Sequence, residues 1–378
     1  SAAMTDLAEQ LRSLPTGIRS RLEAQGFDED WFIREAKRLD EEGRRDNTVK
    51  GEVAPPADED IVDLPERGSE EWESLTEDGL AELAEGRAAL VVLAGGMATR
   101  MGGVVKALVE ALPGHTFLDL RLAGHRALEE KVGRRIPFWL MTSHATDAAI
   151  RQALGDRLDG YYIATFPQMV SLRLEPDGGL FVDEHGNPSE HAPGHGDFPD
   201  ALRRSGLLDH FLEEGGRYVT SANLDNIGAT LDPTLLGLHR RLGGEVTCEV
   251  VDKQGTDKGG IPARLDGRRM ILEEFRIPES FDPATVRVFN TNTFHFDAEA
   301  LAGLDLDWTY FVVEKEVGGH KVIQLERLVN EVAMVLDMRF VRVPRDGAES
   351  RFLPVKDNEA LEEKRPVLEL VARQRGMI

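Results

Sequence analysis

The sequence predicts an α/β fold, with a mostly parallel β-sheet covered by helices and two inserted β-hairpins. From residue 88 onward, short apolar runs alternate with segments of helical spacing, which is the pattern of a parallel sheet. The clearest run, AALVVL at residues 88 to 93, has no polar alternation, as is typical of a strand buried on both faces. Turn signals containing glycine separate two pairs of strand-like runs, which predicts the two hairpins. These hairpins are expected to pair residues 170–174 with 180–183 and residues 261–265 with 269–275.

The N-terminal part, residues 5 to 87, is expected to form a helical and acidic cap. Residues 5 to 45 carry apolar side chains at helical spacing, interrupted near Pro15. Residues 46 to 70 are rich in Pro, Asp, Glu and Gly, which predicts an irregular covering segment or linker. Residues 72 to 86 predict one more amphipathic helix that ends at a glycine. We expect this part to pack on the rest of the chain.

The main domain is expected at residues 88–357, followed by a helical tail at residues 358–378. Its further strands are predicted at residues 137–141, 161–166, 218–222, 246–251, 286–289, 293–296 and 340–343. Its helices are predicted at residues 117–132, 146–155, 199–214, 233–242 and 325–336. Ligands of such sheets bind beyond the carboxyl ends of the strands, so polar residues at those ends are candidate site residues.

Composition limits the possible partners. The formal net charge is -23, which argues against a general nucleic-acid binder, whose surface would be basic. It still allows a small anionic substrate, because the local charge decides that. No apolar run approaches the ~18 residues of a membrane-spanning helix, so we expect a soluble, cytoplasmic protein. Cys248, the only cysteine, is expected to be a buried core thiol.

A glycine-rich loop follows the first buried strand. Glycine pairs at residues 95–96 and 102–103 let the main chain pass close to a ligand, and Arg100 and Lys106 add positive charge. This arrangement is typical of a phosphate-binding loop, although an ordinary strand-to-helix turn has the same composition. It is not a P-loop, because Lys106 is followed by alanine, and it lacks the glycine spacing of a dinucleotide-binding fingerprint.

Polar groups also follow other predicted strands. The segment NLDN, residues 223–226, could hold Mg²⁺ through Asp225 and a ribose through Asn223, or it could be a simple Asx turn. His195 lies between two glycines at the start of a helix, where an anion is favoured. The amides of residues 290–292 suit hydroxyl groups. Lys356, near the end of the chain, could bind phosphate or be an ordinary surface lysine.

Together, and in this order, these segments resemble the UDP-glucose pyrophosphorylase family, the eukaryotic-type UTP–glucose-1-phosphate uridylyltransferases. The matching stretches are LAGGMATRMGG, TFLDL, GHGDFPDALRRSGLLDHFLEEGGRYVTSANLDNIGATLDP, DKGG, VFNTN, VIQLE and SRFLPVK. The resemblance covers about residues 88–357 and implies a nucleotidyltransferase domain that is Rossmann-like and GT-A-like. The chain looks like a short, bacterial-looking version, expected to lack the family's C-terminal β-helix and to be a monomer or a weak homodimer.

The resemblance also implies roles for individual residues. It places the nucleotide on the loop from Leu93 and Ala94 to Gly95 and Gly96, on Gln168, which reads uracil, and on Gly194, Asn223 and Asp225. It places the sugar on Gly260, Glu273 and Asn292. It implies that Lys106, Arg100, Lys356 and His195 contact or neutralise phosphate, and that Asp225 holds Mg²⁺.

The implied reaction needs no general base, because a sugar 1-phosphate is already an anionic nucleophile. Its oxygen would attack the α-phosphorus of UTP in line, and pyrophosphate would leave, so that catalysis is positioning and charge neutralisation. One alternative is the same reaction on another sugar or cyclitol 1-phosphate, such as N-acetylglucosamine 1-phosphate, or with another nucleoside triphosphate. A non-catalytic nucleotide-sugar sensor is the alternative of another class, and a dinucleotide oxidoreductase is a more distant third.

Overall fold

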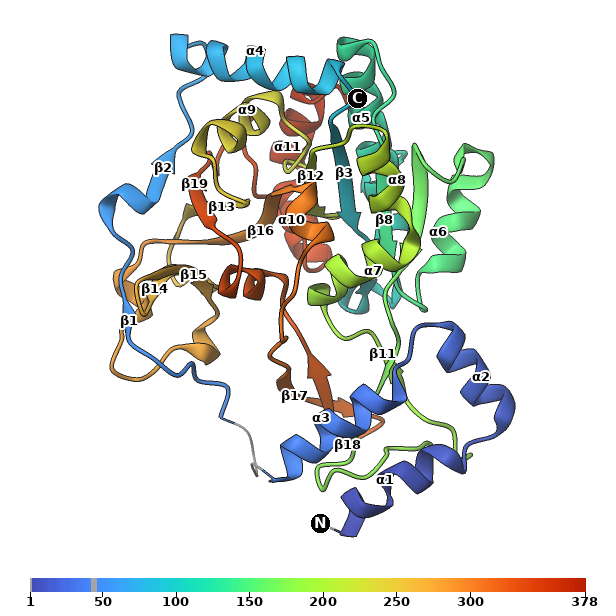
Figure 1. Ribbon diagram of the computed structural model, residues 1–378. Coiled ribbons are helices and arrows are strands. Elements are labelled where there is room, and N and C mark those ends of the chain that lie inside the picture. The colour runs from blue at the N-terminus through green and yellow to red at the C-terminus, as the bar shows by residue number, and fades with distance from the viewer. Residues whose placement is uncertain (1, 42–45) are drawn as a thin grey trace.

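The computed structural model describes residues 2–41 and 46–378, and its centre is an eight-stranded sheet (Figure 1). In spatial order, the strands are β2 (Ile61–Asp63), β19 (Met338–Arg342), β13 (Val246–Asp252), β16 (Val288–Asp297), β12 (Tyr218–Asn223), β3 (Ala88–Leu93), β8 (Phe138–Thr142) and β9 (Ile163–Pro167). Strand β16 is antiparallel to both of its neighbours, and the other neighbouring strands are parallel. The predicted mostly parallel α/β fold is therefore confirmed.

Helices cover both faces of this sheet. One face carries α4 (Glu70–Ala84), α5 (Phe117–Val132), α6 (Asp147–Leu154), α9 (Pro233–Leu242) and α11 (Asn358–Gln374). The other face carries α7 (Phe198–Ser205), α8 (Leu207–Glu213) and α10 (Ala298–Ala302). In β3, Val91 packs into the core of the second face and Leu90 into that of the first. This two-sided burial is the reason that the strand has no polar alternation.

The N-terminal helices are α1 (Ala2–Arg12), α2 (Thr16–Ala24) and α3 (Glu29–Glu41), with a break at Pro15 as expected. Helix α3 lies beside the hairpin of β17 (Phe311–Val317) and β18 (His320–Glu326), in the lower part of the view in Figure 1. The rings of Trp31 and Tyr310 lie 4.6 Å apart between their centroids. The helical prediction is thus confirmed for residues 5–41, and its last four residues, 42–45, lie outside the described residues.

The segment from 46 to 70 is not only a covering linker. Within it, β2 pairs in parallel with β19, through Ile61 and Phe340, and forms one edge of the main sheet. The two-residue strand β1 (Val53–Ala54) pairs with β14 (Ile261–Leu265). A three-residue edge strand is too short to give a detectable period in the sequence, which explains why it was not predicted.

Three predicted elements are corrected by the structure. The helix at 199–214 is two helices, because Gly206 between them adopts the left-handed φ of 81°. The helix at 325–336 is wrong, because residues 320–326 pair with β17 and residues 329–334 form only a 3₁₀ turn. The first hairpin is reduced to one bridge, Leu174 with Leu180, since β10 (Ser171–Leu172) pairs with β11 (Glu190–His191) instead.

The second hairpin is confirmed, although its second strand ends at Leu272 and residues 274–276 form a 3₁₀ turn, and residues 358–374 form a helix. Strand β14 pairs with β15 (Arg268–Leu272), and the turn has positive φ at Asp266 and Gly267, as a tight hairpin requires. Helix α11 is docked through the buried Leu368 and Val371. Among the described residues, no helix is long and apolar enough to cross a membrane.

Helices α4 and α9 cross at very short distance at the top of the view in Figure 1. A Cβ added at Gly79 would lie 1.7 Å from the carbonyl oxygen of Pro233, and one added at Gly237 would lie 2.0 Å from that of Leu75. Helix α4 therefore packs directly on the helix that follows β12. The division of the chain after residues 87 and 357 stays a prediction.

Candidate active site at the carboxyl ends of the strands

The glycine-rich loop after β3 is fixed at its start by the residues that follow β8. The N–H group of Ala94 donates to the carbonyl oxygen of Met141 at 2.8 Å, and the Thr146 hydroxyl donates to the carbonyl oxygen of Ala94 at 3.0 Å. The Ser143 hydroxyl donates to the carbonyl oxygen of Gly95 at 2.9 Å. The loop, which continues from Leu93, thus leaves the sheet in a defined direction at the edge where β3 and β8 end.

The remainder of this loop folds back on itself. Strands β4 (Met97–Ala98) and β5 (Val104–Val105) pair, and Gly102 and Gly103 between them have φ of 96° and 73°, which glycine adopts without strain. Arg100 is exposed on the 3₁₀ turn between the two strands. The N–H group of Lys106 donates to the carbonyl oxygen of Gly96 at 3.3 Å, so the loop closes at this lysine.

Lys106 contacts the segment that follows β12. Its Nζ lies 3.0 Å from Oδ2 of Asp225, and both side chains are partly exposed. The same carboxylate oxygen accepts a hydrogen bond from the N–H group of Val355 at 3.1 Å. Lys356 is exposed and follows Val355 directly, so the main chain that carries it adjoins the pair of Lys106 and Asp225.

The amide residues form a connected row. Asn292 donates from Nδ2 to Oδ1 of Asn223 at 2.9 Å, and its own φ of 62° is left-handed. Its N–H group donates to Oδ1 of Asn290 at 2.8 Å, and the N–H group of Asn290 donates to the carbonyl oxygen of Gly260 at 2.7 Å. The predicted ribose residue and two of the predicted sugar residues therefore lie along one line at the edge of β12 and β16.

Three of the predicted nucleotide-binding residues, Gln168, Gly194 and Gly95, also converge. Gln168 donates from Nε2 to the carbonyl oxygen of Gly194 at 3.1 Å, and its Oε1 lies 3.1 Å from the position of a Cβ on Gly95. Gly194 has a φ of 86°, and a Cβ there would lie 2.7 Å from the carbonyl oxygen of Arg327. Gly194 is thus needed for the main chain to approach Arg327 this closely, whereas a Cβ on Gly95 would require only a small shift of the Gln168 side chain.

His195 is held as a neutral donor. Its Nδ1 accepts a hydrogen bond from the N–H group of Val329 at 3.0 Å, so its proton is placed on Nε2. Burial lowers the pKa of His195 to about 4, which keeps the ring uncharged near neutral pH. An Nε2–H group of this kind can donate to a phosphate oxygen but is a weak base.

Glu273 lies beside Gly260, where an added Cβ would be 2.7 Å from its Oε1. Burial raises the pKa of Glu273 to about 7, and the charges of Glu331 and Glu274 act in the same direction. This carboxyl group is therefore partly protonated near neutral pH, and it can both donate and accept hydrogen bonds toward hydroxyl groups.

Comparisons with known proteins identify the family of the chain. The sequence profile of the UTP–glucose-1-phosphate uridylyltransferases matches residues 30–365. The chain belongs to this family. A uridylyltransferase of Dictyostelium discoideum is 31% identical over 330 residues, which cover 81% of this chain and 62% of the relative. The relative of Astragalus penduliflorus is 30% identical over 94% of this chain, which spans 76% of its length.

Solved structures share the fold. A UDP-glucose phosphorylase of Trypanosoma brucei superposes with a TM-score of 0.76 at 25% identity, covering 97% of this chain and 79% of that one. A UDP-glucose pyrophosphorylase variant of Leishmania major, solved with UDP-glucose, gives a TM-score of 0.71 at 26% identity, covering 96% and 78%. The family assignment made from sequence motifs is thus confirmed.

In this member of the family, several buried charges that support the site were not predicted. Asp197 is one of them, because its carboxylate accepts from the N–H group of Met169 at 2.6 Å and pairs with Arg327 at 2.5 Å. Arg327 also pairs with Asp200 at 2.8 Å. This network ties the residue after Gln168 to the turn of His195. An aspartate directly after Gly-His-Gly was the available signal.

Arg121 of α5 holds the main chain of the segment that carries Asn223 and Asp225. It is fully buried and donates to the carbonyl oxygens of Leu224 at 3.1 Å, Asn226 at 2.5 Å and Ala229 at 2.7 Å, and also to that of Asn223. A helical arginine gives no sequence signal for carbonyl partners about a hundred residues away, so this role could not be predicted.

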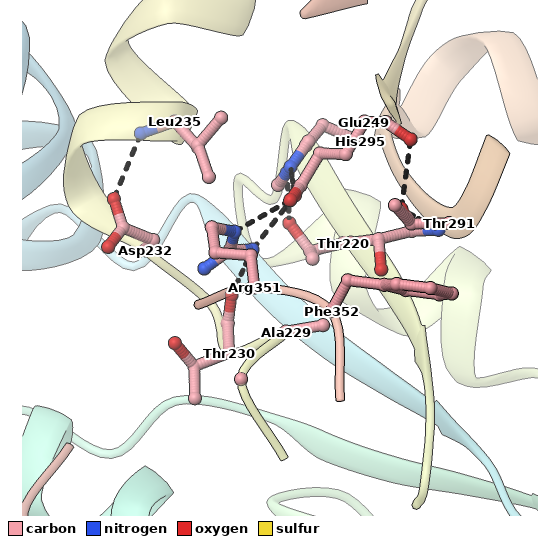
Figure 2. Close-up of polar contacts among 12 residues, drawn as sticks. Thr220, Ala229, Thr230, Asp232, Leu235, Glu249, Thr291, His295, Arg351 and Phe352 are labelled. Atoms are coloured by element: carbon pink, nitrogen blue, oxygen red, sulfur yellow. Dashed lines mark hydrogen bonds and ion pairs between the residues drawn. The ribbon is translucent and has the colours of Figure 1, made fainter. Parts of the chain in front are cut away.

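A second buried arginine fixes the segment that carries Lys356. Figure 2 shows Arg351 facing Glu249 of β13, with ion-pair distances of 2.6 and 2.8 Å, and His295 contacting the same carboxylate at 2.7 Å. Burial alone would raise the pKa of Glu249, but Arg351 and His295 outweigh it and hold it at about 2. The side chain of Asn226 makes two hydrogen bonds with the adjoining main chain. It donates to the carbonyl oxygen of Arg351 and accepts from the N–H group of Leu353.

Proposed function

We propose that the chain makes UDP-glucose and pyrophosphate from UTP and glucose 1-phosphate, by in-line attack of the sugar phosphate on the α-phosphorus. The observation that carries the proposal is the meeting of Lys106, Asp225 and the Lys356 segment at the carboxyl end of β12, beside the Gln168 amide. Family membership gives the reaction class. In this geometry, Lys106 offers positive charge to phosphate and the Gln168 amide offers hydrogen bonds to a base.

The Gln168 amide would read the uracil edge. A glutamine amide both donates and accepts, which suits a base that presents both kinds of group. Its contact with Gly194 and its proximity to Gly95 place it between the glycine-rich loop and the turn of His195. The main chain at Ala94, Gly95 and Gly96 would then follow the nucleotide, and Asn223 would bond its ribose.

The cations would neutralise charge as it moves from the α-phosphate to the leaving pyrophosphate. Lys106 and Lys356 are the best-placed cations, and the exposed Arg100 is on the same loop as Lys106. His195 would donate from Nε2 to the sugar phosphate. Preorganised charges and donors of this kind lower the barrier of phosphoryl and nucleotidyl transfer without an acid or base.

Asp225 fits a divalent ion, Mg²⁺, as a single carboxylate ligand. Within the described residues no group of three or more His, Cys, Asp or Glu side chains could hold a metal alone. An ion at Asp225 would thus be shared with phosphate oxygens, which is the usual arrangement for Mg²⁺. Bound there, it would supply further positive charge. The contact between Asp225 and Lys106 indicates that this lysine must move toward phosphate when the ion binds.

The glucose end would lie along Gly260, Glu273 and Asn292. The amide of Asn292 and the partly protonated Glu273 offer donors and acceptors to sugar hydroxyl groups, and Gly260 leaves room beside the carboxyl group.

The test is a pyrophosphate-release assay that crosses UTP, dTTP, CTP and GTP with a panel of sugar and cyclitol 1-phosphates. We expect the highest kcat/KM for UTP with glucose 1-phosphate. A higher kcat/KM for another sugar phosphate would show that this other compound is the substrate. Nucleotide-sugar binding without any pyrophosphate release would show that the chain is a sensor.

A further inference from the structure

We propose that a second anion site lies behind the candidate active site, in a cavity that would bind a small phosphate-bearing molecule. This cavity, here named the rear cavity, has a volume of about 470 Å³. Its walls come from the start of α4, one side of α5, the start of α9 and the end of α11. A space of this size suits a small organic ligand.

The lining of the rear cavity is basic, although the chain as a whole carries a net charge of -23. Its five cations are Arg67, Arg121, Lys131, Arg351 and Arg375, and its three carboxylates are Glu66, Asp232 and Glu349. Within the lining, Glu349 lies 3.6 Å from Arg67, and Arg351 pairs with Glu249 of β13. Asp232 accepts from the N–H groups at the start of α9 and keeps its charge. Three cations, Arg121, Lys131 and Arg375, then stand against the two carboxylates Glu66 and Asp232, a small excess of positive charge.

Two of the inner arginines have no anionic partner. Arg121 and Arg375 donate only to carbonyl oxygens, and within residues 2–41 and 46–378 neither forms an ion pair with a carboxylate. Burial lowers the pKa of Arg121 to about 9 and that of Arg375 to about 10, although the charge of Asp225 acts on Arg121, and those of Asp232 and Glu349 on Arg375, in the opposite direction. A charge taken out of water is costly unless it is paired, so an anion here would be stabilising.

Two buried nitrogen atoms of the lining also lack hydrogen-bond partners among the described residues. Arg351 uses Nε and Nη2, and its Nη1 has none. Figure 2 shows the third guanidinium nitrogen directed away from Glu249, on the side of Asp232 and Thr230, which line the cavity. His125 donates from Nε2 to a carbonyl oxygen, so its unpartnered Nδ1 is an acceptor. Both atoms are buried beneath the surface of the cavity, so a ligand would reach them only if the lining moved.

The rear cavity is mechanically connected to the candidate active site. Arg121 binds the carbonyl oxygens on both sides of Asp225, and Arg375 binds that of Gly228 at 3.2 Å. An anion that attracts these guanidinium groups would change their hold on the segment that carries Asn223 and Asp225. We therefore expect occupancy to change turnover. This second expectation rests on the proposed function, whereas the binding itself does not.

The test is calorimetric titration of the full chain with inorganic pyrophosphate and, separately, with glycerol 1-phosphate. To remove the candidate active site, the titrations use the double variant Lys106→Ala, Lys356→Ala. In this background we expect pyrophosphate still to bind at one site per chain, and the further change Arg375→Gln to weaken it at least about tenfold. Lys131→Gln, at the exposed rim, covers the case in which Arg375→Gln does not fold.

The matched control is Arg126→Gln, which removes an exposed cation of the same helix α5 outside the cavity and should leave binding unchanged. Loss of all pyrophosphate binding in the double variant would overturn the proposal, as would equal weakening by Arg126→Gln. Tighter binding of glycerol 1-phosphate than of pyrophosphate would identify an organic phosphate as the occupant, and the reverse an inorganic one. If the chain releases no pyrophosphate from any substrate but gives the expected titration results, the proposed reaction is refuted and the anion site in the rear cavity is supported.

Discussion

Replacing Lys106 by alanine should reduce turnover far more than it reduces stability. Its Nζ lies 3.0 Å from Oδ2 of Asp225, and the side chains are 21% and 15% exposed. At an effective dielectric constant of about 20, that distance corresponds to about 5 kcal/mol of attraction before desolvation and side-chain ordering are subtracted. What remains for folding in such a partly exposed pair is about 1 kcal/mol or less.

The loss in the reaction should be larger, because Lys106 would stabilise charge on phosphate in the transition state. One charge-assisted contact is worth about 1.5–3 kcal/mol, which is one to two decades in kcat/KM for UTP. The assay is pyrophosphate release, with thermal unfolding measured on the same samples. Lys50→Ala, which removes an exposed lysine of the N-terminal part, is the control. If Lys106→Ala lowers the melting temperature but leaves kcat/KM unchanged, the lysine is structural and the assignment is wrong.

Four further outcomes can be measured. Gln168→Glu should impair the use of UTP, because a carboxylate cannot donate to the base, and equal use of UTP and ATP by the unmodified chain would refute base reading. Asp225→Asn should shift the Mg²⁺ titration of activity to higher concentration, and an unchanged curve would remove Asp225 as a metal residue. Since the pKa of Glu273 is raised from 4.5 to about 7, this carboxyl contributes less to stability as pH rises through that window. The melting temperature of Glu273→Gln minus that of the unmodified chain should therefore increase as pH rises. A difference that stays constant with pH would contradict this. Light scattering at micromolar concentration should show a monomer or weak dimer, because a net charge of -23 opposes self-association at low salt, and a stable octamer would contradict it.

Elements with strong local signals could be predicted from the sequence. Helix α5 begins after Thr116 because its hydroxyl and the Asp119 carboxylate form a reciprocal capping box, which the sequence shows directly. Helix α9 ends at Gly243, which adopts a left-handed conformation with φ of 75°, and a glycine after a helical run is also a signal in the sequence. Residues 320–326 form a strand because they pair with β17 in a hairpin, across a turn in which Gly318 and Gly319 both have positive φ. A Gly-Gly pair between two strand-like runs is a local hairpin signal, and the helical spacing after it was given too much weight.

The same distinction applies to the candidate site. Asn223 and Asp225 could be proposed because polar residues after buried strands gather at one edge of a parallel sheet. Gln168 was proposed only because the resemblance to the family implies it. Arg121 and Arg351 could not, because their partners are carbonyl groups and a carboxylate more than a hundred residues away in sequence. Sequence patterns thus located residues that would touch substrate and missed those that hold them.

The pairing of β2 with β19 has a kinetic consequence. Ile61 meets Phe340, so one edge of the sheet closes only when two segments separated by most of the chain come together. Contacts of such long range form slowly, since much loop entropy must be lost before they stabilise anything. Until β19 arrives, β13 presents an unpaired edge in a parallel sheet, which is a template for association with other chains. Synthesis that stalls before residue 338 would therefore leave an aggregation-prone intermediate, and chaperones that cover strand edges should act on this chain late in its production.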